Sequence, residues 1–114
     1  MNLINFLKSK EYIVDMMIHD FKEFRYGYFV KIQCIFNNGF EFHIKEYVDE
    51  NSRNYSFHLQ DSDSKFIARW DNAPHHKSLK SYPHHFHQFD EVYESYDITY
   101  DEIFSKIETL FLNL

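Results

Sequence analysis

The sequence has one cysteine, two glycines and two prolines, and no run of apolar residues is longer than three. The lone Cys34 cannot form a disulfide within the chain, so the fold does not depend on an oxidising compartment. Such short apolar runs provide neither a membrane span nor the apolar core of a signal peptide. The scarcity of glycine and proline excludes a collagen-like or linker-like chain. We therefore expect a folded protein of the cytoplasm that does not enter a membrane.

The abundant residues are apolar and aromatic. Hydrophobic residues occupy 44% of the 114 positions, and aromatic residues alone occupy 20%. A chain of this length can bury one hydrophobic core but is too short for two. No stretch has the composition of a linker between domains, so we expect a single domain that spans residues 1–114.

Two segments have the apolar spacing of amphipathic helices. Residues 2–9 begin with an asparagine suited to cap a helix, and Thr99 with Glu102 forms the pattern of a capping box before residues 100–114. Between them, apolar and polar residues alternate in short runs separated by turn-forming residues, which is typical of antiparallel strands. The predicted strands are 29–36, 40–48, 55–60 and 65–71, and residues 12–24 are interpreted as a strand although their apolar residues fit neither period well.

This order predicts an α+β fold: an antiparallel β-meander of about five strands, with a short N-terminal helix and a C-terminal helix packed on one face. Glu46 has the same parity as the apolar residues of its strand, so we expect it to be buried and paired with Arg69; a role as a catalytic acid is the alternative. The predicted core consists of Val30, Ile32, Phe36, Phe40, Phe42, Ile44, Phe57, Leu59, Ile103, Ile107, Leu110 and Phe111.

Charge is unevenly distributed along the chain. The formal net charge is −6, and residues 90–114 contain seven acidic residues but only one basic residue, Lys106. Non-specific binding to nucleic acid requires basic surface, so the overall charge argues against a protein that binds duplex DNA. Five of the eight histidines lie between His75 and His87, together with Lys77 and Lys80 and without an acidic residue. An anion-binding surface is therefore expected in that segment.

The segment 71–87 lacks apolar periodicity and is long for a connection in a small domain, which is typical of functional loops. It contains two Pro-His-His triplets, at residues 74–76 and 83–85. Proline restricts its own backbone and that of the preceding residue, so each triplet presents its histidines from a stiffened chain.

Several motifs in this part of the chain resemble one known family. They are Lys45–Asp49, Tyr55–Asp61, Arg69–His76 with its Asp-Asn-Ala-Pro-His-His stretch, and Tyr82–His85. Together they resemble the toxin components of TumE–TumA toxin–antitoxin systems, over about residues 29–87. The chain departs from the family pattern at Trp70, where tyrosine is usual, and at Phe86, where lysine is common; the second change lowers the basic charge expected at an RNA contact. The resemblance implies a small cytoplasmic toxin that an antitoxin encoded beside it neutralises.

Histidines in such a loop are suited to acid–base chemistry. Neutral and protonated imidazoles act as general base and general acid near neutral pH, which is what a metal-independent ribonuclease requires. An aspartate, Asp71 or Asp61, orients one imidazole, basic residues stabilise the charge on phosphorus, and an exposed aromatic ring stacks on a base. The candidate catalytic residues are Asp71, His75, His76, His84 and His85, and the candidate RNA-binding residues are Arg69, Lys77, Lys80 and Tyr47.

Two other interpretations of the histidines stay open. Histidines with an aspartate also bind Zn²⁺, Ni²⁺ or Mn²⁺, although adjacent histidines on an extended strand diverge, so only one of each pair would bind the metal easily. Alternatively, the loop is structural, and the protein is a non-catalytic binding module. The expected partners are the cognate antitoxin, RNA and a second copy of the chain.

Overall fold

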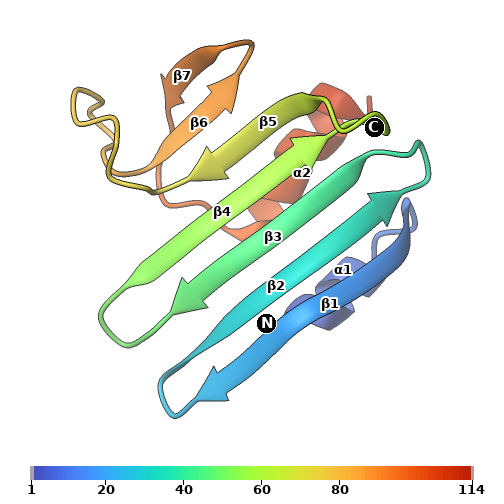
Figure 1. The fold of residues 1–114 in the computed structure, drawn as a ribbon, viewed down its shortest axis with the longest axis horizontal. Helices are drawn as coiled ribbons and strands as arrows, with labels where there is room; N and C mark the ends of the chain where they lie inside the picture. The colour runs from blue at the N-terminus through green and yellow to red at the C-terminus, as the bar shows by residue number, and fades with distance from the viewer. Residues whose placement is uncertain (1, 114) are drawn as a thin grey trace.

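In the computed structural model, residues 2–113 are described, and they form one seven-stranded antiparallel sheet with two helices. Every strand pairs with the next one along the chain, and both helices lie behind the sheet in Figure 1, so the opposite face is open. The elements are α1 (Leu3–Lys8), β1 (Ile13–Phe24), β2 (Gly27–Phe36), β3 (Glu41–Val48), β4 (Arg53–Gln60), β5 (Phe66–Asp71), β6 (His85–Gln88), β7 (Glu91–Glu94) and α2 (Tyr100–Phe111).

The α+β architecture and the two helices are confirmed, but the expected count of about five strands is wrong. β6 and β7 were missed because each has only four residues, too few to show a clear alternation of apolar and polar side chains. Their turn also lacks a glycine: Phe89 and Asp90 adopt positive φ angles of 52° and 61°. In a sequence, a tight turn with positive φ angles is normally indicated by Asn-Gly or Asp-Gly, as at Gly39, where φ is 88°.

The prediction of a strand at residues 12–24 is confirmed by β1. Its pairing with β2 shifts register between Ile13 and Asp15 and again between Ile18 and Asp20. Each bulge inserts an extra residue and reverses the inside–outside alternation of the side chains that follow. The bulges therefore explain why the apolar residues of this segment fit neither the strand period nor the helix period.

The core lies between the helices and the sheet. Thr99 accepts from the backbone N–H of Glu102, whose side chain returns to Thr99, so the expected capping box fixes the start of α2. Most predicted core residues are buried, and Phe40 and Phe111 are partly buried. The prediction that Leu110 belongs to the core is wrong, because its side chain is 54% exposed. The buried stripe of α2 ends at Ile107, and Leu110 lies in the last turn, at the rim of a hollow.

Glu46 is buried as expected, but Arg69 is not its partner. Arg53 Nε lies 2.6 Å from Glu46 Oε2, and the hydroxyl of Tyr100 donates to Oε1 at 2.7 Å. The hydroxyl of Tyr28 donates to the same Oε1. Glu46 points toward the helices, whereas Arg69 pairs with His58 on the open face, so the two side chains lie on opposite sides of the sheet. This carboxylate therefore belongs to the core.

No helix within residues 2–113 is both long enough and apolar enough to cross a membrane.

Candidate functional site

The candidate site lies on the open face, where β5 ends and β6 begins. Alternation along β5 places Arg69 and Asp71 on the open face and Trp70 on the helix-covered face. In the pairing of β5 with β6, His85 lies opposite Asp71, and His87 lies opposite Arg69. Two neighbouring strands thus bring four polar side chains together.

Asp71 is at the centre of this group and only 4% exposed. Its Oδ1 lies 2.8 Å from His85 Nε2, and its Oδ2 accepts from Arg69 Nε at 2.9 Å. The other ring nitrogen of His85, Nδ1, donates to the carbonyl of Pro83 at 2.9 Å. Each nitrogen of this buried ring therefore contacts an oxygen that can accept a hydrogen bond. His85 and Asp71 hold each other in place.

Two further histidines surround His85. The ring of His76, from the loop after β5, packs edge-on against His85 with 4.7 Å between centroids, and the ring of His87 does so at the same distance. The rings of His76 and His87 are 5.4 Å apart. Potential metal-binding nitrogens of the three side chains all lie within 4.8 Å of one another. We refer to Arg69, Asp71, His76, His85 and His87 as the Asp71 cluster.

The electrostatics of the cluster favour a neutral His87. Burial is the largest cause of its lowered pKa, and the nearby His85 lowers the pKa further, while Asp71 opposes both effects. His87 Nε2 lies 3.8 Å from Asp71 Oδ2, which is too far for a hydrogen bond. A neutral imidazole of this kind can accept a proton from a substrate.

Both ends of the loop that carries His76 are held by hydrogen bonds. The amide of Asn72 accepts from the N–H of Tyr55 at 2.9 Å and donates to the carbonyl of Arg53 at 2.6 Å. It thus replaces strand pairing where β5 has ended. At the other end, Ser81 Oγ donates to the carbonyl of His84 at 2.7 Å and accepts from the N–H of Ser95. These contacts explain why a loop without apolar periodicity has a defined path.

The structure brings some of the predicted site residues together and separates others. Asp71, Arg69, His76 and His85 lie in the cluster. His84 does not, since its Nδ1 is 2.9 Å from the hydroxyl of Tyr55 and its ring stacks on that tyrosine. The remaining predicted residues lie outside the cluster: His75, Lys77 and Lys80 are exposed along the loop, and Tyr47 is on the open face of β3.

His87 is the cluster residue that the sequence reasoning did not select. The signal was the triplet His85-Phe86-His87, whose alternation places both histidines on one face once the segment is recognised as a strand.

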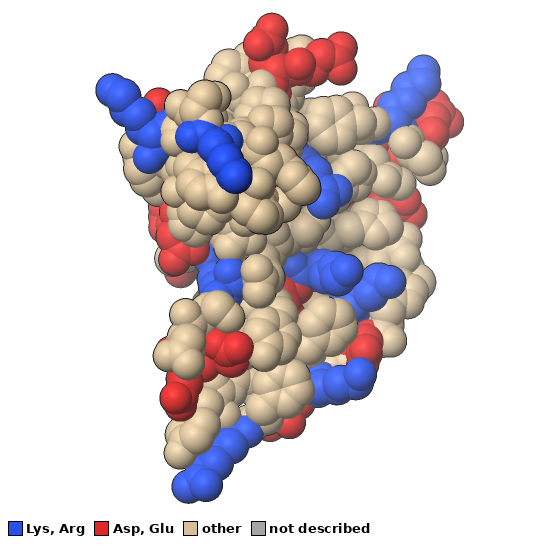
Figure 2. All heavy atoms as spheres, turned by 60° about the vertical axis from the view of Figure 1, so that its left-hand side comes forward, with Lys and Arg blue, Asp and Glu red and all other residues tan. Residues whose placement is uncertain are grey.

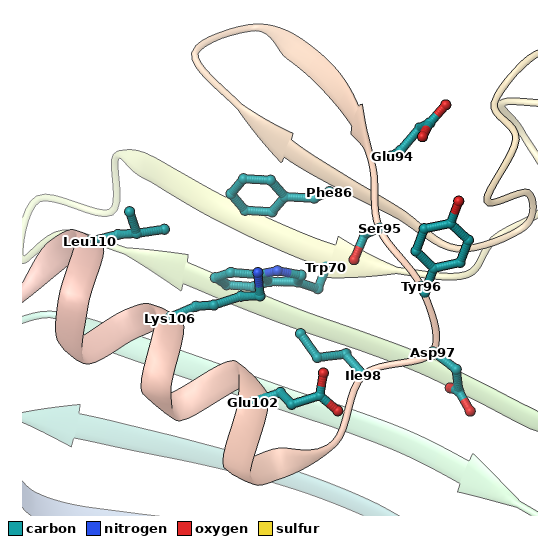
Figure 3. Close-up of a pocket in the computed structure, with 10 residues that line it drawn as sticks. All are labelled: Trp70, Phe86, Glu94, Ser95, Tyr96, Asp97, Ile98, Glu102, Lys106 and Leu110. Carbon is teal, nitrogen blue, oxygen red and sulfur yellow. The ribbon is translucent and has the colours of Figure 1, made fainter.

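Phe86 points to the helix-covered face, where its ring stacks on Trp70 with 4.7 Å between centroids. Figure 3 shows both rings at a hollow of about 270 Å³ between α2 and the segment that follows β7. The expectation that Phe86 in place of a lysine lowers the basic charge at an RNA contact is therefore not supported by geometry. A side chain at this position points away from the Asp71 cluster.

A comparison with protein families shows to which family the chain belongs. The model of the toxin TumE matches residues 3–111, nearly the whole sequence. The chain belongs to the TumE toxin family. No curated protein and no solved structure gives a significant match. Membership in the TumE family makes this protein a toxin component and indicates an antitoxin partner, and the match extends the resemblance at residues 29–87 to both helices.

Proposed function

We propose that this TumE-family protein is the toxin of a toxin–antitoxin pair and that it cleaves RNA in the cytoplasm with histidines as acid and base. The observation that supports this proposal is the Asp71 cluster, in which three imidazoles, a carboxylate and a guanidinium from three segments of chain converge on an open face. One cluster thus contains groups that can accept a proton, donate a proton and stabilise phosphate charge.

The geometry suggests a role for each side chain. His87 takes the proton from a ribose 2′-hydroxyl, whose oxygen attacks the adjacent phosphorus, and His76 gives a proton to the departing 5′-oxygen. The products are a 2′,3′-cyclic phosphate and a 5′-hydroxyl. Arg69 uses its remaining guanidinium N–H groups on the phosphate oxygens. His85 and Asp71, which are buried and bonded to each other, are positioning residues.

The test is cleavage of purified bacterial RNA by the purified protein, with analysis of the product ends. We expect 2′,3′-cyclic phosphate ends, formed also in the presence of a chelator, and a rate that passes through a maximum as pH is varied. His76→Ala and His87→Ala should each reduce the rate by about 100-fold or more. His75→Ala is the matched control, since it removes the neighbouring histidine, which is exposed outside the cluster.

Expression in cells gives a second readout. The wild type should arrest growth unless the antitoxin gene is expressed with it, and the two cluster variants should not arrest growth. If the double variant H76A/H87A still arrests growth and the wild type cleaves no RNA, the proposal is wrong, and a non-catalytic binding toxin replaces it.

A second candidate function rests on the spacing of the histidine nitrogens. Donor atoms of His76, His85 and His87 lie close enough for one divalent metal. The hydrogen bond from His85 Nδ1 to Pro83 holds the ring as metal-binding histidines are commonly held, but Nε2 lies 2.8 Å from Asp71 Oδ1 and would have to exchange this contact for the metal. Zn²⁺, Ni²⁺ or Mn²⁺ would then activate a water molecule for RNA hydrolysis. In that case a chelator abolishes cleavage, and added metal restores it.

A further inference from the structure

The open face of the sheet carries a row of side chains that leads from β2 to the Asp71 cluster. Lys31 on β2 lies directly opposite Lys45 on β3, which lies opposite Ser56 on β4, which in turn lies opposite Asp71 on β5. Neighbouring strands are about 4.8 Å apart, so the row spans roughly 14 Å. A chain molecule laid along it would pass the two lysines and reach the cluster.

The two lysines are an unusual pair for a sheet. Like charges directly opposite each other destabilise a strand pair, and within residues 2–113 no carboxylate lies within ion-pair distance of either Lys31 or Lys45. Both are exposed. Figure 2 shows several blue side chains near the middle of this view, with tan and some red side chains beside them. Asp20 on β1 lies opposite Lys31 on its other side, but its carboxylate pairs with Lys22 at 3.6 Å, so the two lysines give this row local positive charge although the net charge is −6.

The surface is also hollowed beside this row. One hollow of about 340 Å³ is lined by His43 and His58 among others, and a second of about 310 Å³ is lined by Phe29 and Tyr47 among others. Lys45, Ser56 and Arg69 line both hollows, so they adjoin. We call the combined depression the Lys45 trough.

Two partly exposed aromatic residues of the trough are placed for stacking. Phe29 lies directly opposite Tyr47 in the pairing of β2 with β3, and both are partly exposed on the open face. The ring of Tyr47 packs against Phe24 with 5.8 Å between centroids, and its hydroxyl donates to Asp49 at 3.0 Å, so both contacts order the ring. An unpaired base can place its face on such a ring, whereas bases within a duplex are stacked on one another.

We propose that the Lys45 trough binds single-stranded RNA and guides it to the Asp71 cluster. Phosphates contact Lys31 and Lys45, and a base stacks on Tyr47 beside Phe29. The inference rests on the proposed action on RNA and adds the substrate class, which is unpaired rather than duplex RNA.

Binding can be separated from cleavage by using a 12-residue 2′-O-methyl RNA, which has no free 2′-hydroxyl to react. Its affinity is measured by fluorescence anisotropy at several salt concentrations. Lys45→Ala should weaken binding about fivefold at 0.1 M salt and reduce the salt dependence by ~0.7 in log–log slope, and Lys31→Ala combined with Lys45→Ala should have about twice that effect on the slope. Lys8→Ala removes the same charge from α1 on the opposite face and should change neither quantity.

Stacking is tested at Tyr47. Tyr47→Leu should weaken binding of the same oligonucleotide about tenfold because it removes the ring. Tyr47→Phe loses the hydrogen bond to Asp49 but keeps the ring, so it should bind within about twofold of the wild type. A loss in both variants would assign the effect to the hydrogen bond and overturn the stacking role.

The outcomes distinguish this inference from the proposed function. If the oligonucleotide binds and depends on Lys31 and Lys45 but RNA is never cleaved, the trough stands and the chemistry proposed for the cluster is wrong. If RNA is cleaved but the trough variants bind and cleave like the Lys8 variant, the trough is wrong and the cluster stands. Tighter binding of a duplex of the same sequence, or a loss of antitoxin binding alone in the lysine variants, also overturns the inference.

Discussion

His85 is the residue on which the geometry of the cluster depends. Its ring is 2% exposed and links Asp71 to the backbone carbonyl of Pro83. His85→Ala would leave the buried carboxylate with one partner fewer and create a cavity, so we expect a loss of about 2 to 4 kcal/mol in the free energy of unfolding. Chemical denaturation measures this, with the exposed His75→Ala as control. Equal stability of the two variants would show that the contact with Asp71 is not structural.

Two partly buried histidines predict how stability changes with pH. Burial is the largest cause that lowers the pKa values of His58 and His87 in the folded protein. Above their ordinary value of about 6.5, both residues are neutral in the folded and unfolded states. As pH falls below that value, the unfolded chain binds protons first, so the free energy of unfolding should decrease until the folded-state pKa values are passed.

The measurement is the free energy of unfolding at pH 7.5 and at pH 5.5, for the wild type and for a variant that combines His58→Gln with His87→Gln. The decrease should be smaller in the variant because glutamine does not titrate. An unchanged decrease would attribute the pH dependence to other groups.

At the scale of elements, α2 allows a comparison within one helix. Ile107 is fully buried, whereas Leu110, one turn later, is 54% exposed. Ile107→Ala should cost about 2 to 5 kcal/mol, and Leu110→Ala should stay within about 0.5 kcal/mol. Thermal or chemical unfolding of both variants tests this expectation. Similar costs for the two variants would contradict the observed docking of the helix.

The sequence was informative where an element was long and regularly patterned. β2, β3 and β4 alternate over eight or more residues, and the capping box marks α2, so their positions followed from local rules. β6 and β7 did not, because four-residue strands joined by a turn without glycine give no local signal. β6 forms by pairing with β5, and β7 by pairing with β6. The periodicity of a sequence contains no information about such contacts.

The same limit explains which parts of the candidate site were predicted. The motif around Asp71 and the two Pro-His-His triplets located the segment, and Asp71, His76 and His85 do meet. Within the pair His84 and His85, however, only strand alternation decides which ring points to the open face. Since β6 was missed, His84 was included and His87 was left out.

At the scale of the molecule, acidic side chains of the C-terminal segment gather around β7 and the start of α2. Asp97 and Glu102 line the hollow beside Trp70 (Figure 3), Asp90 lies in the turn before β7, and Glu91 is the first residue of β7. Glu94 ends β7 opposite His85, so it projects toward the open face at the rim of the same hollow. Asp97 is already paired with Arg53 at 2.6 Å, so it contributes less free charge than its neighbours. This distribution predicts that the antitoxin presents a basic surface to this part of the molecule.

Association with the antitoxin should therefore depend on salt. We expect the association rate to fall severalfold between low and high ionic strength, and to fall likewise when Glu91 and Glu94 are both changed to glutamine. Stopped-flow or surface-based binding kinetics measure this, with Asp63→Asn in the β4–β5 turn as a control for charge alone. A rate that does not change with salt would exclude this surface.

The expected second copy of the chain stays a prediction. β1 is an edge strand, and Val14, Ile18 and Phe21 on it are about half exposed or more.

The strictly sequential order of the strands has a consequence for synthesis on the ribosome. Each strand can pair with the one made just before it, so the sheet can grow hairpin by hairpin as the chain emerges. The core cannot be completed in that way, because α2 follows all seven strands and its contact from Glu108 to Tyr12 joins residues 96 positions apart. Until α2 emerges, the nascent sheet has an uncovered apolar face. A toxin built in this order acquires its stable fold only after α2 has emerged.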